Sequence, residues 1–186
     1  ADKGLKIVAL SDISGGIYDA NGLDPYKVEE YAKAHDGLIK GYPGATAISG
    51  DEVLLQDVDV LIPAALELQI TEKNADKIKA KMIVEAANGP TDDKADVILH
   101  KRGIEVVPDV LANGGGVTVS YVEWVQNLNR YFWTEEDVVD RQEPMMDKPF
   151  AIVYDAAKKY NTTMRVGAYI VAIGTIAEAL KLRKGL

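Results

Sequence analysis

Two asparagines that follow short apolar runs are the residues whose type and position best suit ligand binding. Asn88 comes soon after Met82–Ala86, and Asn113 follows Ile104–Val107 after a short connection. A side-chain amide offers two donors and an acceptor, so a pair of them can orient a flat polar ligand. In an open parallel sheet the strands end at a common edge, where such folds hold their ligands. We therefore expect Asn88 and Asn113 to point into a shared crevice.

Three consecutive glycines come directly after Asn113. Gly114–Gly116 carries no side chains, so the backbone there can turn sharply and a flat ligand can lie against it. A helix-like stretch, Val117–Tyr131, begins at this point, with Ser120 in its first turn. Free backbone N–H groups and the helix dipole favour an anion at that place. The pattern predicts a binding edge.

Apolar runs alternate with helix-like segments over the first two thirds of the chain. The predicted strands are Leu5–Leu10, Val58–Ala64, Met82–Ala86 and Ile104–Val107. Helices are predicted after Asp24 (to about Asp36-Gly37), Ser49 (to about Gln56), Thr71 (through Lys79) and Thr91 (through Arg102). This alternation indicates βαβ units and an α/β fold with a doubly wound parallel sheet.

The last third of the chain is predicted to be helical, without strands. The expected helices are Val117–Tyr131, Glu135–Tyr160 and Arg165–Lys184. Pro144 and Pro149 should break or kink the middle one, because proline removes a helical hydrogen bond and clashes with the preceding turn.

Composition narrows the class of protein and of partner. The 186 residues suffice for a sizeable core, and a net charge of −8 argues against nucleic acid as a partner. With no cysteine, disulfides, thiolate catalysis and zinc–thiolate sites are excluded. No spacing of His35 and His100 suggests a metal site. With no membrane-length apolar stretch and no signal-peptide pattern, we expect a cytoplasmic protein with no membrane partner.

The first predicted strand ends in Ser11-Asp12, which resembles the second strand of a dinucleotide fold. There an acidic residue holds a ribose by its hydroxyls, roughly 20 residues after a glycine-rich phosphate loop. Counting back that far from Asp12 runs off the start of the chain. We expect the chain to begin inside a larger protein, after the first strand and its phosphate loop. The alternative is that Asp12 only ends a strand and begins a turn.

Several segments resemble the glutamate dehydrogenases in order and spacing, over nearly the whole chain. They are Ser11-Asp12, Gly15–Tyr18, Pro63–Glu67, Glu85–Thr91 and Pro108–Asn127. The resemblance implies reversible oxidative deamination of L-glutamate to 2-oxoglutarate and ammonia, with NAD or NADP as the cofactor. It also implies a partial, Rossmann-like dinucleotide-binding domain over residues 1–131. The helical segment 132–186 would pack on that domain and, in the full enzyme, extend towards the substrate domain.

The same resemblance assigns roles to particular positions. The implied cofactor-binding residues are Ser11, Asp12, Ala64, Ala65, Asn88 and Asn113. Asp12 would contact the adenosine ribose, Asn88 would lie by the nicotinamide ribose, and Asn113 would hold the carboxamide. Val117 and Ser120 would meet the glutamate side chain, with the serine hydroxyl donating to its γ-carboxylate.

The family's catalytic lysines and aspartate lie in an N-terminal domain without a counterpart here. We therefore assign no catalytic residue, and we expect the chain to be inactive alone and the full-length protein to be a homohexamer. An acid at position 12 disfavours a 2′-phosphate, which slightly favours NAD. The alternatives are a leucine, phenylalanine or valine dehydrogenase, in which Ser120 would have no purpose, and a non-catalytic, truncated binding module.

Overall fold

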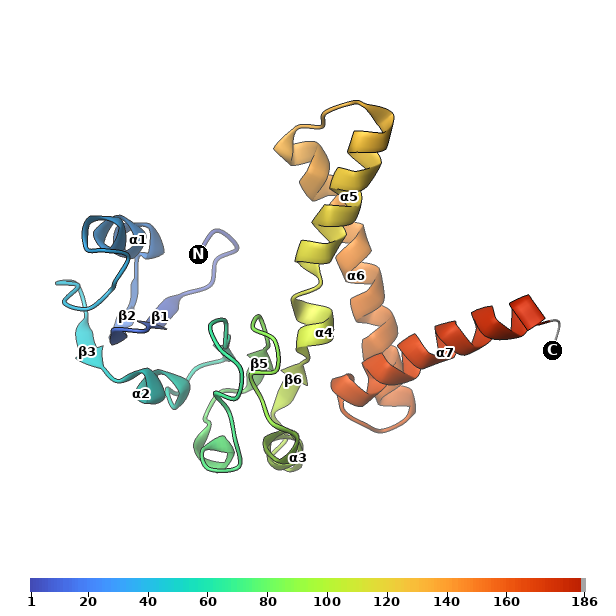
Figure 1. Cartoon of the computed structure of the whole chain (residues 1–186). Coiled ribbons are helices and arrows are strands. Elements are labelled where there is room, and N and C mark those ends of the chain that lie inside the picture. Colours follow the sequence, from blue (N-terminus) through green and yellow to red (C-terminus); the bar gives the residue numbers. More distant parts are fainter. Residues whose placement is uncertain (185–186) are drawn as a thin grey trace. The chain divides into compact units, whose positions relative to one another are not determined.

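The computed structural model describes residues 1–184, which form two compact units (Figure 1). The first unit comprises residues 1–61 with 77–80, and the second comprises 62–76 with the chain from residue 81 onward. The domain boundary that the sequence suggested at residue 131 lies within the second unit.

The first unit contains an antiparallel sheet of β1 (Ile7–Asp12), β2 (Gly15–Leu23) and β3 (Thr46–Ile48), in that order. The sequence predicted β1 as a parallel strand, but its partner among the described residues is the antiparallel β2, which was not predicted. The glycines at 15 and 16 suggested a turn, yet they open β2. Gly15 has φ +132°, a conformation that glycine adopts readily and that allows this tight entry.

Helix caps in the first unit agree with the sequence. α1 (Pro25–Ala34) begins after Asp24, whose carboxylate accepts hydrogen bonds from the N–H groups of residues 26 and 27. α2 (Gly50–Leu54) has the predicted capping box, in which Ser49 and Glu52 each accept from the other's backbone N–H. β4 (Val60–Leu61) is shorter than its predicted strand. A buried cluster, Ile17, Leu23, Val28 and Ile39, joins α1 to β2.

The second unit contains the predicted parallel crossover. β5 (Met82–Val84) and β6 (Glu105–Val107) pair in parallel, and α3 (Asp93–Lys101) connects them. The helix predicted from Thr71 to Lys79 is wrong, because this segment contains only the 3-10 turn η1 (Ala75–Lys77). The Asn74 side chain accepts from the N–H of Thr71 at 2.8 Å and donates to a carbonyl at residue 69. These bonds belong to a single capped turn, in which the Thr71 carbonyl also accepts from the N–H of Ala75 at 2.9 Å, and the helical turn continues only into η1.

The C-terminal part is helical, as predicted. Its helices are α4 (Asp109–Ala112), α5 (Gly115–Asn129), α6 (Glu135–Lys159) and α7 (Met164–Lys184). α6 continues through Pro144 and Pro149, so neither proline ends it. A capping box of Thr134 and Asp137 begins α6, and the helix packs on α5 and α7. Among residues 1–184 no individual helix is both long and apolar enough to cross a membrane.

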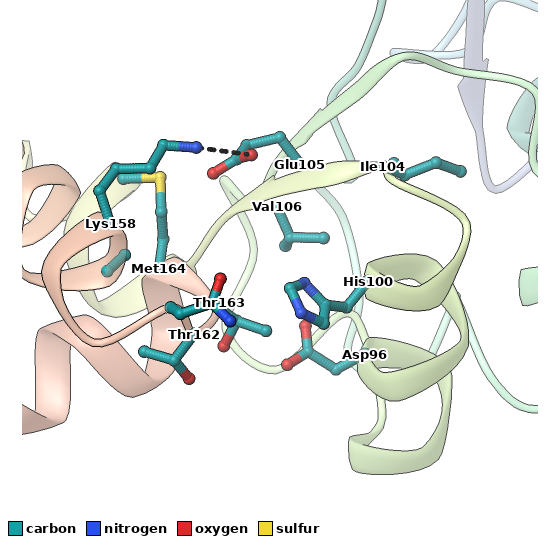
Figure 2. Close-up of a pocket in the computed structure, with 11 residues that line it drawn as sticks. Asp96, His100, Ile104, Glu105, Val106, Lys158, Thr162, Thr163 and Met164 are labelled. Carbon is teal, nitrogen blue, oxygen red and sulfur yellow. Dashed lines mark ion pairs between the residues drawn. The ribbon is translucent and has the colours of Figure 1, made fainter.

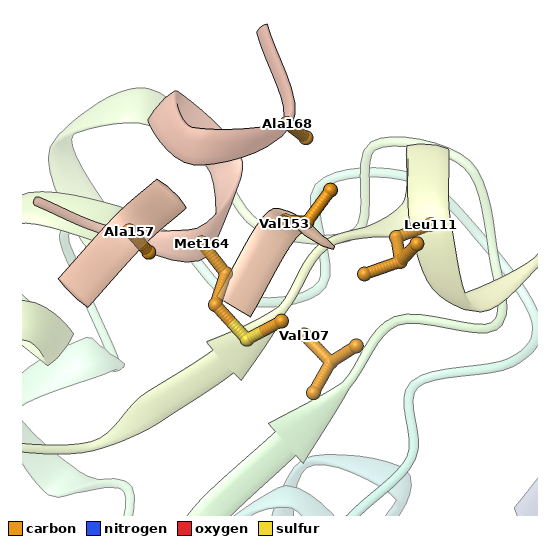
Figure 3. Packing of buried hydrophobic residues seen from close by; sticks show 6 residues of the cluster. All are labelled: Val107, Leu111, Val153, Ala157, Met164 and Ala168. Carbon is orange, nitrogen blue, oxygen red and sulfur yellow. The ribbon is translucent and has the colours of Figure 1, made fainter. Parts of the chain in front are cut away.

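A buried apolar cluster fixes the end of β6 against the C-terminal helices (Figure 3). Its members are Val107, Leu111, Val153, Ala157, Met164 and Ala168. Because one member lies at the end of β6 and another in α4, the packing of α6 and α7 determines where α4 starts. The cluster therefore sets the position of Asn113, which directly follows α4.

Charged groups gather beside this cluster, at the carboxyl ends of β5 and β6. Arg165 of α7 contacts Glu85 at 2.7 Å, Asp109 at 3.3 Å and Asp96 at 3.5 Å. Glu85 is fully buried. Burial raises the pKa of Asp96 above its ordinary value, and the partial attraction of Arg165 does not reverse this. The reason is that the guanidinium is shared with two closer carboxylates.

The cap of α3 gives a first test. Asp92, not the predicted Thr91, caps this helix, accepting from the N–H of Ala95 at 2.6 Å. The Thr91 hydroxyl is buried and has no hydrogen-bond partner among the described residues. We expect Asp92→Ala to lower the free energy of unfolding by about 1 kcal/mol, and Thr91→Val to leave it unchanged or raise it. Urea unfolding of both variants, with the exposed Asp93→Ala as the control, checks this. A larger loss for Thr91→Val would contradict the assignment.

Three carboxylates surround the single guanidinium of Arg165, and this arrangement gives a second test. Since burial raises the folded-state pKa of Asp96, ionisation of this carboxyl costs stability as the pH rises through that pKa. We expect Asp96→Asn to raise Tm by roughly 2 °C at neutral pH. The gain should shrink as the pH is lowered from neutral towards the ordinary pKa of an aspartate, because Asp96 becomes protonated, and so neutral like asparagine, above that pH. Thermal unfolding of both proteins across this pH range measures the difference. A neutral-pH Tm that falls would show that the Arg165 contact outweighs burial.

Candidate functional site

The two asparagines singled out by the sequence meet at the carboxyl ends of β5 and β6. The amide Nδ2 of Asn113 donates to Oδ1 of Asn88 at 2.6 Å. Both side chains are exposed enough to leave their remaining donors and acceptors open to a ligand. The prediction that these amides come together is confirmed.

An open pocket of about 580 Å³ surrounds the amide pair. The residues that line it are Ala65, Leu66, Glu67, Ala86, Ala87, Asn88 and Asn113. Residues 65–67 form one wall of the pocket, and residues 86–88 form another. The two segments are linked by the carbonyl of Pro63, which accepts from the N–H groups of Ala86 and Ala87 at 3.1 and 2.9 Å. The lining surface of the pocket is more polar than apolar, and convergent polar side chains of this kind can fix the orientation of a small polar ligand.

Besides the two asparagines, the lining contains one predicted site residue and four that were not predicted, namely Leu66, Glu67, Ala86 and Ala87. Ala65 lines the pocket, whereas Ala64 is not among its lining residues. Glu67 adds a carboxylate that the sequence analysis did not single out. Its place in the Pro63–Glu67 segment, after the predicted strand that ends at Ala64, was the available signal.

The loop that carries Asn88 depends on Gly89. This glycine has φ +54°, and its N–H donates to Oδ2 of Asp109 at 2.8 Å. The left-handed backbone turns the chain immediately after the amide, while the hydrogen bond ties the loop to the start of α4. Asn88 is therefore held by a defined turn.

The predicted substrate residues lie on α5 and outside the lining of the pocket. Val117 is 73% exposed. The Ser120 hydroxyl donates to the carbonyl of Gly116 at 3.1 Å, one turn earlier in the same helix. A γ-carboxylate only accepts hydrogen bonds, so Ser120 would have to turn its hydroxyl away from Gly116 to bind one. The structure thus brings neither residue into contact with the amide pair.

In the first unit, Asp12 has a clear structural task. Its carboxylate accepts from the N–H of Ser14 at 2.7 Å and from the N–H of Ile39 at 2.8 Å, while Ser11 pairs with Gly16. Burial opposes its charge, but hydrogen bonds from Ser14 and Ile39 keep the pKa of Asp12 below its ordinary value. These contacts agree with the alternative that Asp12 closes a turn, and its ribose contact stays a prediction.

A second, smaller pocket of about 130 Å³ lies near the amino end of β6, between α3 and the α6–α7 connection (Figure 2). Asp96, His100 and Glu105 are among its lining residues, and Lys158 forms a long 4.0 Å ion pair with Glu105. Within residues 1–184 no group of three or more His, Asp or Glu is arranged to hold a metal ion.

Comparison with known proteins points to one family. Residues 1–184 match the family described as Glutamate/Leucine/Phenylalanine/Valine dehydrogenase. The chain is 51% identical over 180 residues to a glutamate dehydrogenase of Thermotoga maritima, covering 97% of this chain and 43% of that relative. It is 50% identical over 173 residues to the NAD-specific glutamate dehydrogenase of Clostridioides difficile, covering 93% and 41%.

Solved structures agree with this match. The hetero-hexameric glutamate dehydrogenase of Thermus thermophilus, in its Leu-bound form, aligns with a TM-score of 0.89 and 33% identity, over 98% of this chain and 42% of that one. The likeness confirms the predicted Rossmann-like α/β class. The chain spans less than half the length of each of these relatives. By sequence and by fold, it belongs to the Glutamate/Leucine/Phenylalanine/Valine dehydrogenase family.

Proposed function

We propose that this chain is the nucleotide-binding part of a glutamate dehydrogenase, which converts L-glutamate reversibly to 2-oxoglutarate and ammonia with NAD or NADP. The observation that carries the proposal is the amide pair of Asn88 and Asn113, 2.6 Å apart at the ends of parallel strands and facing an open pocket. Identities of 50 and 51% to glutamate dehydrogenases support the reaction class. The bound cofactor would supply hydride transfer.

The residues that line the pocket are suited to bind the nicotinamide and the ribose attached to it. Asn113 would hold the nicotinamide carboxamide, since an amide matches both the donor and the acceptor of that group. Asn88 would lie by the neighbouring ribose, and Ala65 would form the adenosine side with Ala64. The pocket volume lies in the range usual for small-molecule sites. A ribose contact for Ser11 and Asp12 belongs to the same proposal.

Polarisation of the substrate and transfer of its proton are proposed for the complete enzyme. The groups that polarise the substrate and move its proton are assigned to no residue of this chain. Alone, it would bind nucleotide at most, and we propose a cytoplasmic homohexamer as the active form. One relative is a hetero-hexamer by its description, so oligomeric state should be measured on the complete protein.

Glutamate is proposed as substrate because of a hydroxyl in the first turns of α5. By exchanging its bond to the Gly116 carbonyl, the Ser120 hydroxyl can donate to a γ-carboxylate, whereas a leucine, phenylalanine or valine side chain offers no acceptor. For the cofactor, the acid at position 12 and the relative described as NAD-specific favour NAD over NADP. A lower KM for NADP in the complete enzyme would refute this preference.

The amide pair gives a direct test. In the complete enzyme we expect Asn113→Ala to raise the Kd for NADH about tenfold, because one carboxamide contact is lost. The matched control is Asn129→Ala, which removes an amide bonded only to a carbonyl of its own helix, at the far end of α5. Calorimetric titration of both variants measures the effect. If NADH binding is unchanged in Asn113→Ala, the pocket is not the nicotinamide site.

Substrate choice gives another test. Ser120→Ala in the complete enzyme should lower kcat/KM for glutamate about tenfold and leave that for leucine near its starting value. Thr175→Val is the control, since Thr175 donates to a carbonyl one turn earlier in α7, as Ser120 does in α5. Initial rates of cofactor reduction with glutamate, leucine and phenylalanine give these values. A wild-type preference for leucine would overturn the substrate assignment, and no oxidation of any amino acid would favour a non-catalytic module.

A further inference from the structure

The amide pair belongs to a closed ring of hydrogen bonds that passes through Asp109. The Asp109 carboxylate accepts from the N–H of Gly89, the residue after Asn88, at 2.8 Å. The Asp109 carbonyl accepts from the backbone N–H of Asn113 at 3.0 Å. The 2.6 Å bond between the two amides completes the ring. A displacement of Asp109 would therefore change the separation and orientation of Asn88 and Asn113.

Asp109 is held in turn by two residues deeper in the unit. Its N–H donates to Oε2 of Glu85 at 2.8 Å, and its Oδ1 lies 3.3 Å from Nη1 of Arg165. The other arm of the guanidinium, Nη2, lies 2.7 Å from Oε1 of Glu85. Arg165 thus spans both carboxylates with its planar fork, which a lysine ammonium cannot do. Glu85 is fully buried and the Arg165 side chain is 18% exposed, so little water competes for these bonds.

We propose that Arg165 is a positioning residue for the nicotinamide half of the cofactor. It acts through Glu85 and Asp109 on the amide pair, and it is not among the residues that line the pocket. The inference rests on the proposed function, because it takes the pocket at Asn88 and Asn113 to be the nicotinamide site. It adds that α7, which follows all the residues of the pocket in sequence, determines how tightly that site binds its ligand.

The test compares two nucleotides that differ in the group the amide pair would hold. NADH carries the nicotinamide and its ribose, and ADP lacks both. In the complete enzyme, Arg165→Lys keeps a positive charge near buried Glu85 but removes the fork. We expect the Kd for NADH to rise about tenfold and the Kd for ADP to stay within about twofold. A general loss of packing would weaken both ligands alike.

A second variant changes Asp109, through which Arg165 would act on the amide pair. Asp109→Asn preserves shape and leaves the ion pair of Arg165 with Glu85 in place. Its amide must turn an NH₂ group towards either the N–H of Gly89 or the guanidinium, and both are donors. The same selective loss of NADH binding is expected, and this variant decides the matter if Arg165→Lys does not fold. Lys158→Met is the control, because it breaks an exposed pair with Glu105 near the start of β6 and should change neither Kd.

A double variant separates this inference from the proposed function. If Arg165 acts through the amide pair, adding Arg165→Lys to Asn113→Ala should weaken NADH binding little further. Equal weakening of NADH and ADP binding in the Arg165 and Asp109 variants, or no weakening of either, would overturn the positioning role while leaving the proposed function intact. If Asn113→Ala itself does not change NADH binding, the proposed nicotinamide site fails first, and the positioning role fails with it.

Discussion

The ion cluster around Arg165 is the constraint on which the arrangement of the second unit depends. Glu85 has no access to water, and a buried carboxylate persists only with a cation and hydrogen bonds around it. Arg165 supplies the cation, and the N–H of Asp109 supplies a bond to its other oxygen. The ends of two strands and the first turn of α7 are therefore fixed together. Removing one partner would cost more than the pair contributes, because the other charge would be left uncompensated.

Much of the fold follows from local sequence patterns, but the segment after Thr71 and the helix α6 depart from them. Asp24 and Ser49 cap their helices as predicted, because a side-chain oxygen before an exposed N–H needs no tertiary partner. Thr71 begins only a single turn, in which its carbonyl accepts from the N–H of Ala75, and this turn continues no further than η1. α6 passes through Pro144 and Pro149, which propensity alone does not predict. There, packing against α5 and α7 and the cap at Thr134 outweigh the missing hydrogen bonds.

Part of the candidate site could be predicted from the sequence. Asn88 and Asn113 could be placed together because parallel strands end at one edge, so a residue just past each strand must lie near the other. Arg165 could not be found in this way, since no spacing rule relates it to Glu85 or Asp109. Its role emerges only from the packing of α7 against the end of β6, which is a tertiary contact.

The sequence separation within the ion cluster bears on how the polypeptide matures during synthesis. Glu85 and Arg165 are 80 residues apart, so the acidic end of β5 leaves the ribosome long before its cation is made. Until α7 emerges, that carboxylate must stay hydrated, and the surrounding apolar residues cannot close over it. Final compaction around these strand ends is thus deferred until α7 has been synthesised. In a nascent chain halted before residue 165, the Glu85 carboxylate and the neighbouring strand ends would stay exposed to solvent.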